Sequence, residues 1–151
     1  MTDIRFYQLL ATPLDIALPK LLEKAVGQGM RAVVATGSAE RAQTLDTALW
    51  TYSESSFLAH GRAGADTATA AQQPIWLAIG IENPNAARLL IVLDGQQPED
   101  FAAWERVCDM FDGTDETALA NARGRWKSLK DAGHALSYWR QTPAGGWEKA
   151  A

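Results

Sequence analysis

The chain has few residues of the kinds that hold metals or cross-link a fold. It contains one cysteine, Cys108, and two histidines, His60 and His134. A single cysteine excludes an internal disulfide, and no His or Cys pair has the spacing of a zinc site. A Cys–His nucleophilic pair is arithmetically possible. However, Cys108 falls in a segment with amphipathic helical spacing, where a packed, unreactive thiol is the simpler interpretation. We therefore expect no metal and no cofactor.

Long apolar runs and an excess of positive charge are also missing. The N-terminal segment MTDIRFYQLL has neither the basic region nor the apolar core of a signal peptide, so we expect a cytoplasmic protein without membrane association. A net charge of −4 disfavours nucleic-acid binding by the whole molecule, because such binding needs a net basic surface. With 151 residues, 47% of them hydrophobic, we expect one well-packed domain over residues 1–151.

The order of the apolar segments predicts an α/β fold. We expect strands over 4–10, 31–35, 74–79, 89–93 and 135–141, and helices over 13–27, 39–51, 99–111 and 115–132. Residues 61–73 are small and polar and are predicted to form a surface loop, and 142–151 a tail. Alternating strands and helices favour a Rossmann-like three-layer sandwich with a mostly parallel central sheet.

This fold is expected without a nucleotide-binding fingerprint. After the second strand comes Thr36-Gly37-Ser38, which is neither a P-loop nor a GxGxxG turn. Asp15, Glu40, Asp46 and Asp94 could in principle form an acid/base pair, but solvated carboxylates and helix caps are the simpler interpretation. A nucleotide-dependent enzyme on this fold is therefore the alternative and not the leading hypothesis.

One segment stands out by its charge. Asn121–Lys130, NARGRWKSLK, has four basic residues and no acidic one. On a helix, the spacing puts one aromatic and three cationic side chains along one side: Arg123, Trp126, Lys127 and Lys130. The neighbouring Phe111 and Leu119 add apolar surface. This combination favours a binding surface for a partner that is acidic and partly apolar. A buried Trp126 with ordinary solvated cations, or direct binding of DNA, are the alternatives.

A second candidate surface is the segment 50–60, WTYSESSFLAH. Trp50 ends the predicted helix, and Tyr52, Phe57 and Leu58 follow without helix or strand periodicity. Large apolar residues on a loop often contact another protein. The alternative is a loop folded back over the core.

These residues carry a family resemblance that covers nearly the whole chain. The run LDTALWTYSESSFLAHG, the opening FYQL, CDMFDGTDETA, ARGRWKSLKDAGH and the terminal Trp147 resemble the chi subunit of bacterial DNA polymerase III. The family has Pro before the His, where this chain has Ala59. The resemblance implies a non-catalytic clamp-loader subunit with a Rossmann-like fold. Its implied partners are the psi subunit, the clamp loader through psi, and the acidic C-terminal tail of single-stranded-DNA-binding protein, with DNA reached only indirectly.

The resemblance also implies residue roles. Arg123 is expected to pair with the terminal carboxylate of the tail and Trp126 to pack on its last apolar residues. Phe111 and Leu119 are expected to wall the pocket, while Lys127 and Lys130 attract acidic residues of the tail. The positions matched to the psi-facing surface are Trp50 and Phe57, with Leu58 and His60 as neighbours.

Overall fold

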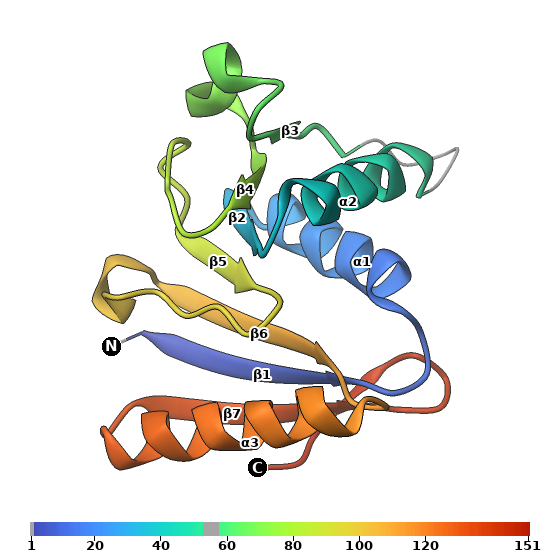
Figure 1. The fold of residues 1–151 in the computed structure, drawn as a ribbon, viewed down its shortest axis with the longest axis vertical. Helices are drawn as coiled ribbons and strands as arrows, with labels where there is room; N and C mark the ends of the chain where they lie inside the picture. Colours follow the sequence, from blue (N-terminus) through green and yellow to red (C-terminus); the bar gives the residue numbers. More distant parts are fainter. Residues whose placement is uncertain (1, 53–57) are drawn as a thin grey trace.

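The computed structural model describes residues 2–52 and 58–151 and arranges them around one twisted sheet (Figure 1). The strands are β1 (Asp3–Leu9), β2 (Ala32–Thr36), β3 (Gly61–Arg62), β4 (Ile75–Ile79), β5 (Leu89–Val92), β6 (Arg106–Asp112), β7 (Ala135–Gln141) and β8 (Trp147–Lys149). In the described residues their order is β3-β4-β2-β5-β6-β1-β7-β8. Neighbouring strands are parallel except for β7 with β8.

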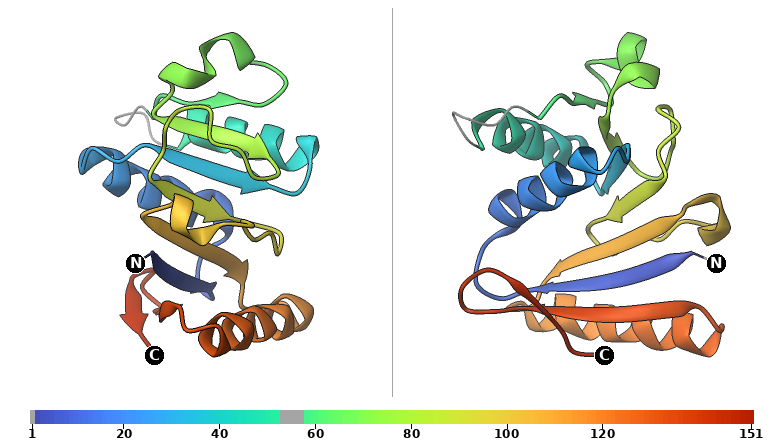
Figure 2. Two further views of the ribbon diagram at one scale, coloured as in Figure 1. Left: turned by 90° about the vertical axis from the view of Figure 1, so that its left-hand side faces the viewer. Right: turned by 180° about the vertical axis from the view of Figure 1, so that it is seen from behind.

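Helices cover both faces of the sheet. They are α1 (Leu14–Gly27), α2 (Ala39–Thr51), α3 (Glu116–Asp131) and the short 3-10 helices η1 (Thr67–Gln72) and η2 (Phe101–Ala103). Residues of α1 and α2 form one core cluster with the strand side chains that point to one face of the sheet. Residues of α3 form a second cluster with the alternating side chains that point to the other face. Figure 2 shows α3 running along β7, away from α1 and α2. The predicted three-layer α/β sandwich with a mostly parallel sheet is therefore confirmed.

Helix ends follow the expected chemistry. The Ser38 hydroxyl accepts a hydrogen bond from the amide of Arg41 at the start of α2, and the Asp115 carboxylate accepts from two amides at the start of α3. Gly133 adopts φ 86° after α3, and the amide of His134 donates to the Leu129 carbonyl at 3.1 Å. This left-handed cap explains why α3 stops there.

One predicted helix is wrong. Residues 99–111 form η2 followed by β6, which lies in the sheet between β5 and β1. The apolar positions of this segment fit helical spacing by coincidence, while β6 is buried on both faces because it is an inner strand. Its one buried charge, Asp109, is paired with a residue of α3, which single-sequence periodicity does not reveal.

Two smaller predictions also need correction. Residues 61–73 are not a plain loop, since they contain β3 and η1. The expected tail 142–151 contains β8, which pairs with β7 and places Trp147 against Tyr7, with ring centroids 4.9 Å apart. Both strands have only two or three residues, which is too short to show the alternation that identifies a strand in the sequence. Among the helices of the described residues, none combines the length and apolarity that crossing a membrane requires.

Two glycines, one just before α3 and one inside it, offer a matched test of this fold. A Cβ added at Gly113 would clash with the Gln8 side chain and lie 2.8 Å from the carbonyl oxygen of Leu9. A Cβ at Gly124, inside α3, would meet nothing within 4 Å. We expect Gly113→Ala to lower the free energy of unfolding by about 1–3 kcal/mol. We expect Gly124→Ala to raise it by about 0.5–1 kcal/mol.

Urea denaturation of the two variants measures both effects. Equal changes in the two variants would contradict the close backbone approach at Gly113.

Candidate partner-binding surfaces

An ion pair fixes α3 to the sheet. The Arg125 guanidinium donates to both carboxylate oxygens of Asp109 on β6, at 2.7 and 3.0 Å. The side chains are 13% and 5% exposed, respectively. Burial raises the pKa of Asp109, and the hydrogen bonds and charge of Arg125 oppose that shift. The two-pronged contact sets which flank of α3 faces the inner strands.

The other flank of α3 carries unpaired cations. Arg123, Lys127 and Lys130 are exposed, and none of their side chains makes a hydrogen bond or an ion pair with the described part of the chain. Two arginines only two positions apart therefore differ completely in environment. The Arg125 side chain is bound to Asp109 within the fold, and the Arg123 side chain is exposed to solvent.

Beside these cations lies an aromatic cluster. The Trp126 ring contacts Phe6 and Tyr138 edge to face, with centroid distances of 5.4 and 5.6 Å. Phe111 is buried and lies 6.2 Å from Tyr138 between ring centroids. Trp126 and Leu119 are only partly buried against this cluster. Part of the apolar surface thus stays accessible next to the free cations.

The six residues that the sequence singled out on α3 and just before it fall into two groups in the structure. Three supply charge, and three belong to one apolar cluster: Arg123, Lys127 and Lys130, with Phe111, Leu119 and Trp126. We call this set the α3 surface. The alternative of a core Trp126 is partly right, since the ring packs on the sheet as well as facing outward.

Sequence reasoning missed Arg125 and Tyr138. A signal for Arg125 was present, because it lies three residues after Ala122 and four before Leu129, which are both buried. Such spacing indicates an inward position. The spacing of residues in α3 does not indicate that Tyr138, on β7, lies beneath the helix. Its place under α3 follows from the pairing of β7 with β1.

The second predicted surface lies at the end of α2. Trp50 is 54% exposed, and its ring lies 4.6 Å from the His60 ring between centroids. The predicted contact residue Phe57 lies outside the described residues. Leu58 and His60 are buried, so they do not offer side chains to a partner in the way Trp50 does.

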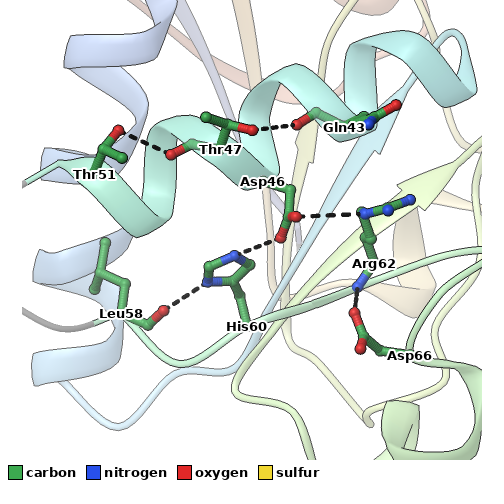
Figure 3. Close-up of polar contacts among 8 residues, drawn as sticks. All are labelled: Gln43, Asp46, Thr47, Thr51, Leu58, His60, Arg62 and Asp66. Atoms are coloured by element: carbon green, nitrogen blue, oxygen red, sulfur yellow. Dashed lines mark hydrogen bonds and ion pairs between the residues drawn. The ribbon is translucent and has the colours of Figure 1, made fainter.

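His60 instead ties the segment 58–62 to α2 (Figure 3). Its Nδ1 lies 2.6 Å from the carbonyl oxygen of Leu58, and its Nε2 lies 2.8 Å from Oδ1 of Asp46 on α2. The second carboxylate oxygen of Asp46 is 3.4 Å from Nε of Arg62. The buried His60 ring of this network is the member that contacts the Trp50 ring. We call Trp50 with this network the α2 surface.

The turns that bind phosphate in nucleotide-binding Rossmann folds are closed by the chain's own side chains. After β1, three successive amides, those of Leu10, Ala11 and Thr12, donate to Oε1 of the buried Gln141 at 3.0, 2.8 and 3.0 Å. After β2, the amide of Gly37 donates to Asp94 at 2.9 Å. After β6, Asp115 caps α3. These backbone donors are therefore already bonded and are not free for a phosphate.

Cys108 lies on β6 and not on a helix, and it is fully packed. Burial raises the pKa of its thiol to about 12, so the thiolate is not the prevailing form at neutral pH. The prediction of a packed thiol agrees with this environment, although the element was misassigned. In the described ranges, no group of three or more His, Cys, Asp or Glu side chains is arranged to hold a metal ion.

The fold and these surfaces define a Rossmann-like α/β protein with internally closed β–α turns and an exposed cationic helix. Residues 1–137 match the family model described as "DNA polymerase III chi subunit, HolC", so the chain belongs to the chi subunit family of DNA polymerase III.

Two curated relatives agree with the family. "DNA polymerase III subunit chi" of Pseudomonas aeruginosa (strain PAO1) is 27% identical over 140 residues, which cover 90% of this chain and 94% of that protein. "Probable DNA polymerase III subunit chi" of Rickettsia prowazekii (strain Madrid E) is 31% identical over 86 residues, or 57% of this chain. That match spans about half (49%) of the Rickettsia protein.

Removing Arg125 tests its structural role against Arg123. We expect Arg125→Ala to lower the free energy of unfolding by about 3–5 kcal/mol at neutral pH, because it leaves Asp109 buried without its partner. Without that partner the pKa of Asp109 rises further, so the folded chain binds a proton more tightly than the unfolded chain. The deficit should therefore shrink as the pH falls toward the ordinary Asp value.

Chemical denaturation at several pH values measures this dependence. Arg123→Ala is the matched control, and we expect it to change stability by less than about 0.5 kcal/mol. Comparable losses in both variants would show that Arg125 is not the anchor.

Proposed function

We propose that this chain is a non-catalytic accessory subunit of the DNA polymerase III holoenzyme. In this role it pairs with the psi subunit of the clamp loader through the α2 surface. Through the α3 surface it binds the acidic C-terminal tail of single-stranded-DNA-binding protein. It thereby links the replicase to coated template, and DNA is reached only through partners.

The observation that carries the proposal is the unpaired Arg123 beside the partly accessible Trp126. A peptide's C-terminal carboxylate is the anion that a guanidinium binds most directionally, through charge-assisted hydrogen bonds. An apolar residue just before that carboxylate can pack against the aromatic cluster. Lys127 and Lys130 extend the positive charge along α3 and suit acidic residues upstream in the tail.

The energetics fit a modest, salt-sensitive contact. One charge-assisted contact and burial of one apolar side chain support an affinity for an isolated tail on the order of micromolar. Exposed charges are screened by salt, so the affinity should fall as ionic strength rises. Several tails on one oligomer would raise the apparent affinity by avidity.

The first test removes Arg123, the proposed partner of the terminal carboxylate of the tail. We expect Arg123→Ala to weaken binding of a tail peptide about tenfold or more. Calorimetric titration measures this, with Lys24→Ala as the control because Lys24 is an exposed cation on α1, at the other face. Pairing with psi should be unchanged in both variants. Equal loss of peptide and psi binding in Arg123→Ala would count against two separate sites.

The second test concerns the α2 surface. We expect Trp50→Ala to reduce pairing with psi at least tenfold while sparing the tail peptide, because a large exposed aromatic side chain is a typical hot spot. Ile79→Ala is the control, since Ile79 is 45% exposed at the end of β4. Co-purification with psi at unchanged yield from Trp50→Ala would remove this surface from the proposal.

Two alternatives have direct tests. An enzyme using a nucleotide would have to bind it without the amides of Leu10, Ala11, Thr12 and Gly37, which are already bonded. Specific thermal stabilisation by a nucleotide at sub-millimolar concentration would support it. Direct DNA binding through α3 is disfavoured by the net charge of −4. Tight binding of bare single strands at physiological salt would support it.

A further inference from the structure

A fourth unpaired cation lies beside the α3 surface, on a different element. Arg140 is exposed on β7, and its side chain makes no hydrogen bond or ion pair with the part of the chain that the structure describes. Residue 140 lies beyond residue 137, where the family-model match ends, so the family match assigns nothing to it.

The sheet register places Arg140 on the α3 side. Arg140 pairs with Gln8 of β1, and Gln8 pairs with Phe111 of β6, so the three residues form one row across the sheet. Phe111 belongs to the core cluster under α3, and side chains of one row point to the same face. Arg140 therefore stands on the face that α3 covers, in line with a proposed wall of the tail site.

Tyr138 connects Arg140 to Arg123. Tyr138 lies two residues before Arg140 on β7, so both point to the same face. Its hydroxyl donates to Oε1 of Gln8 at 2.8 Å, and its ring contacts Trp126, three residues after Arg123. Burial raises the pKa of the Tyr138 hydroxyl, while the positive charges of Arg140 and Arg123 both oppose the shift. The charges of both guanidinium groups thus act on the hydroxyl of one half-buried tyrosine.

Nothing in the described residues neutralises Arg140. Its cross-strand neighbour on β8 is Glu148, and no ion pair joins them. Two arginines with unpaired side chains, one on α3 and one on the strand face that α3 covers, form a suitable pair of donors for one carboxylate.

We propose that Arg140 binds the terminal carboxylate of the tail together with Arg123, so that the chain end lies over Tyr138 between α3 and β7. This inference rests on the proposed function of the α3 surface. It adds a specificity determinant on β7, because a ligand with a free chain end would gain from both arginines and one without it would not.

The experiment compares a tail peptide carrying a free C-terminal carboxylate with the same peptide amidated. We expect Arg140→Ala to weaken binding of the free-acid peptide about tenfold and to leave binding of the amide nearly unchanged. Arg140→Lys should restore part of the loss, because it keeps the charge and loses the planar fork. Circular dichroism checks that each variant is folded.

Lys149→Ala is the matched control. Lys149 is exposed on β8 opposite Trp139, whose side chain packs with the α1 cluster, so Lys149 points to the other face of the same hairpin. We expect it to leave both affinities unchanged. A loss of equal size for the acid and the amide in Arg140→Ala would overturn the inference, because it would mean general charge attraction. No loss at all would overturn it too.

The results for the different variants distinguish failure of the role of Arg140 from failure of the proposed tail binding. If Arg123→Ala weakens the free-acid peptide and Arg140→Ala does not, only the role of Arg140 is wrong. If the unaltered protein does not bind the free-acid peptide, the tail function and this inference fail together.

Discussion

The ion pair between Arg125 and Asp109 decides what α3 can offer to a partner. A charged pair this deeply buried is held by its two hydrogen bonds, and it fixes the helix about its own axis. With Arg125 turned toward β6, the opposite flank with Arg123 must face outward along β7. The orientation of one helix thus divides four neighbouring cations into one structural anchor and three available charges.

Side chains of the chain itself also close turns at the carboxyl edge of the sheet. Gln141 comes from the end of β7 and occupies the three amides of the turn after β1, and its Nε2 donates to Thr12 at 2.6 Å. Asp94 closes the turn after β2. These contacts join distant segments at the carboxyl edge of the sheet, where this fold usually binds ligands. The proposed ligand surfaces lie instead on the helices.

Local chemistry in the sequence predicted much of this architecture, and long-range pairing limited the rest. The apolar runs of β2 and β5 and the helical spacing of α2 and α3 are local features, and these elements were predicted close to their observed bounds. Strand β6 was predicted as a helix because its burial depends on the two neighbouring strands. The charge of its Asp109 is paired by a residue of α3, which follows later in the chain. The charge pattern of α3 identified Arg123. The sheet face on which Arg140 lies depends instead on the register of β7 with β1, which no local sequence pattern contains.

The central claim is that the outer flank of α3, next to β7, receives an acidic chain end. Titration of the isotopically labelled protein with the tail peptide, followed by NMR, tests it most directly. The account predicts that the indole N–H signal of Trp126 and the amide signals of α3 and β7 shift, while those around Trp50 and His60 stay in place. Shifts confined to the α2 surface, or to the turns closed by Gln141 and Asp94, would contradict it.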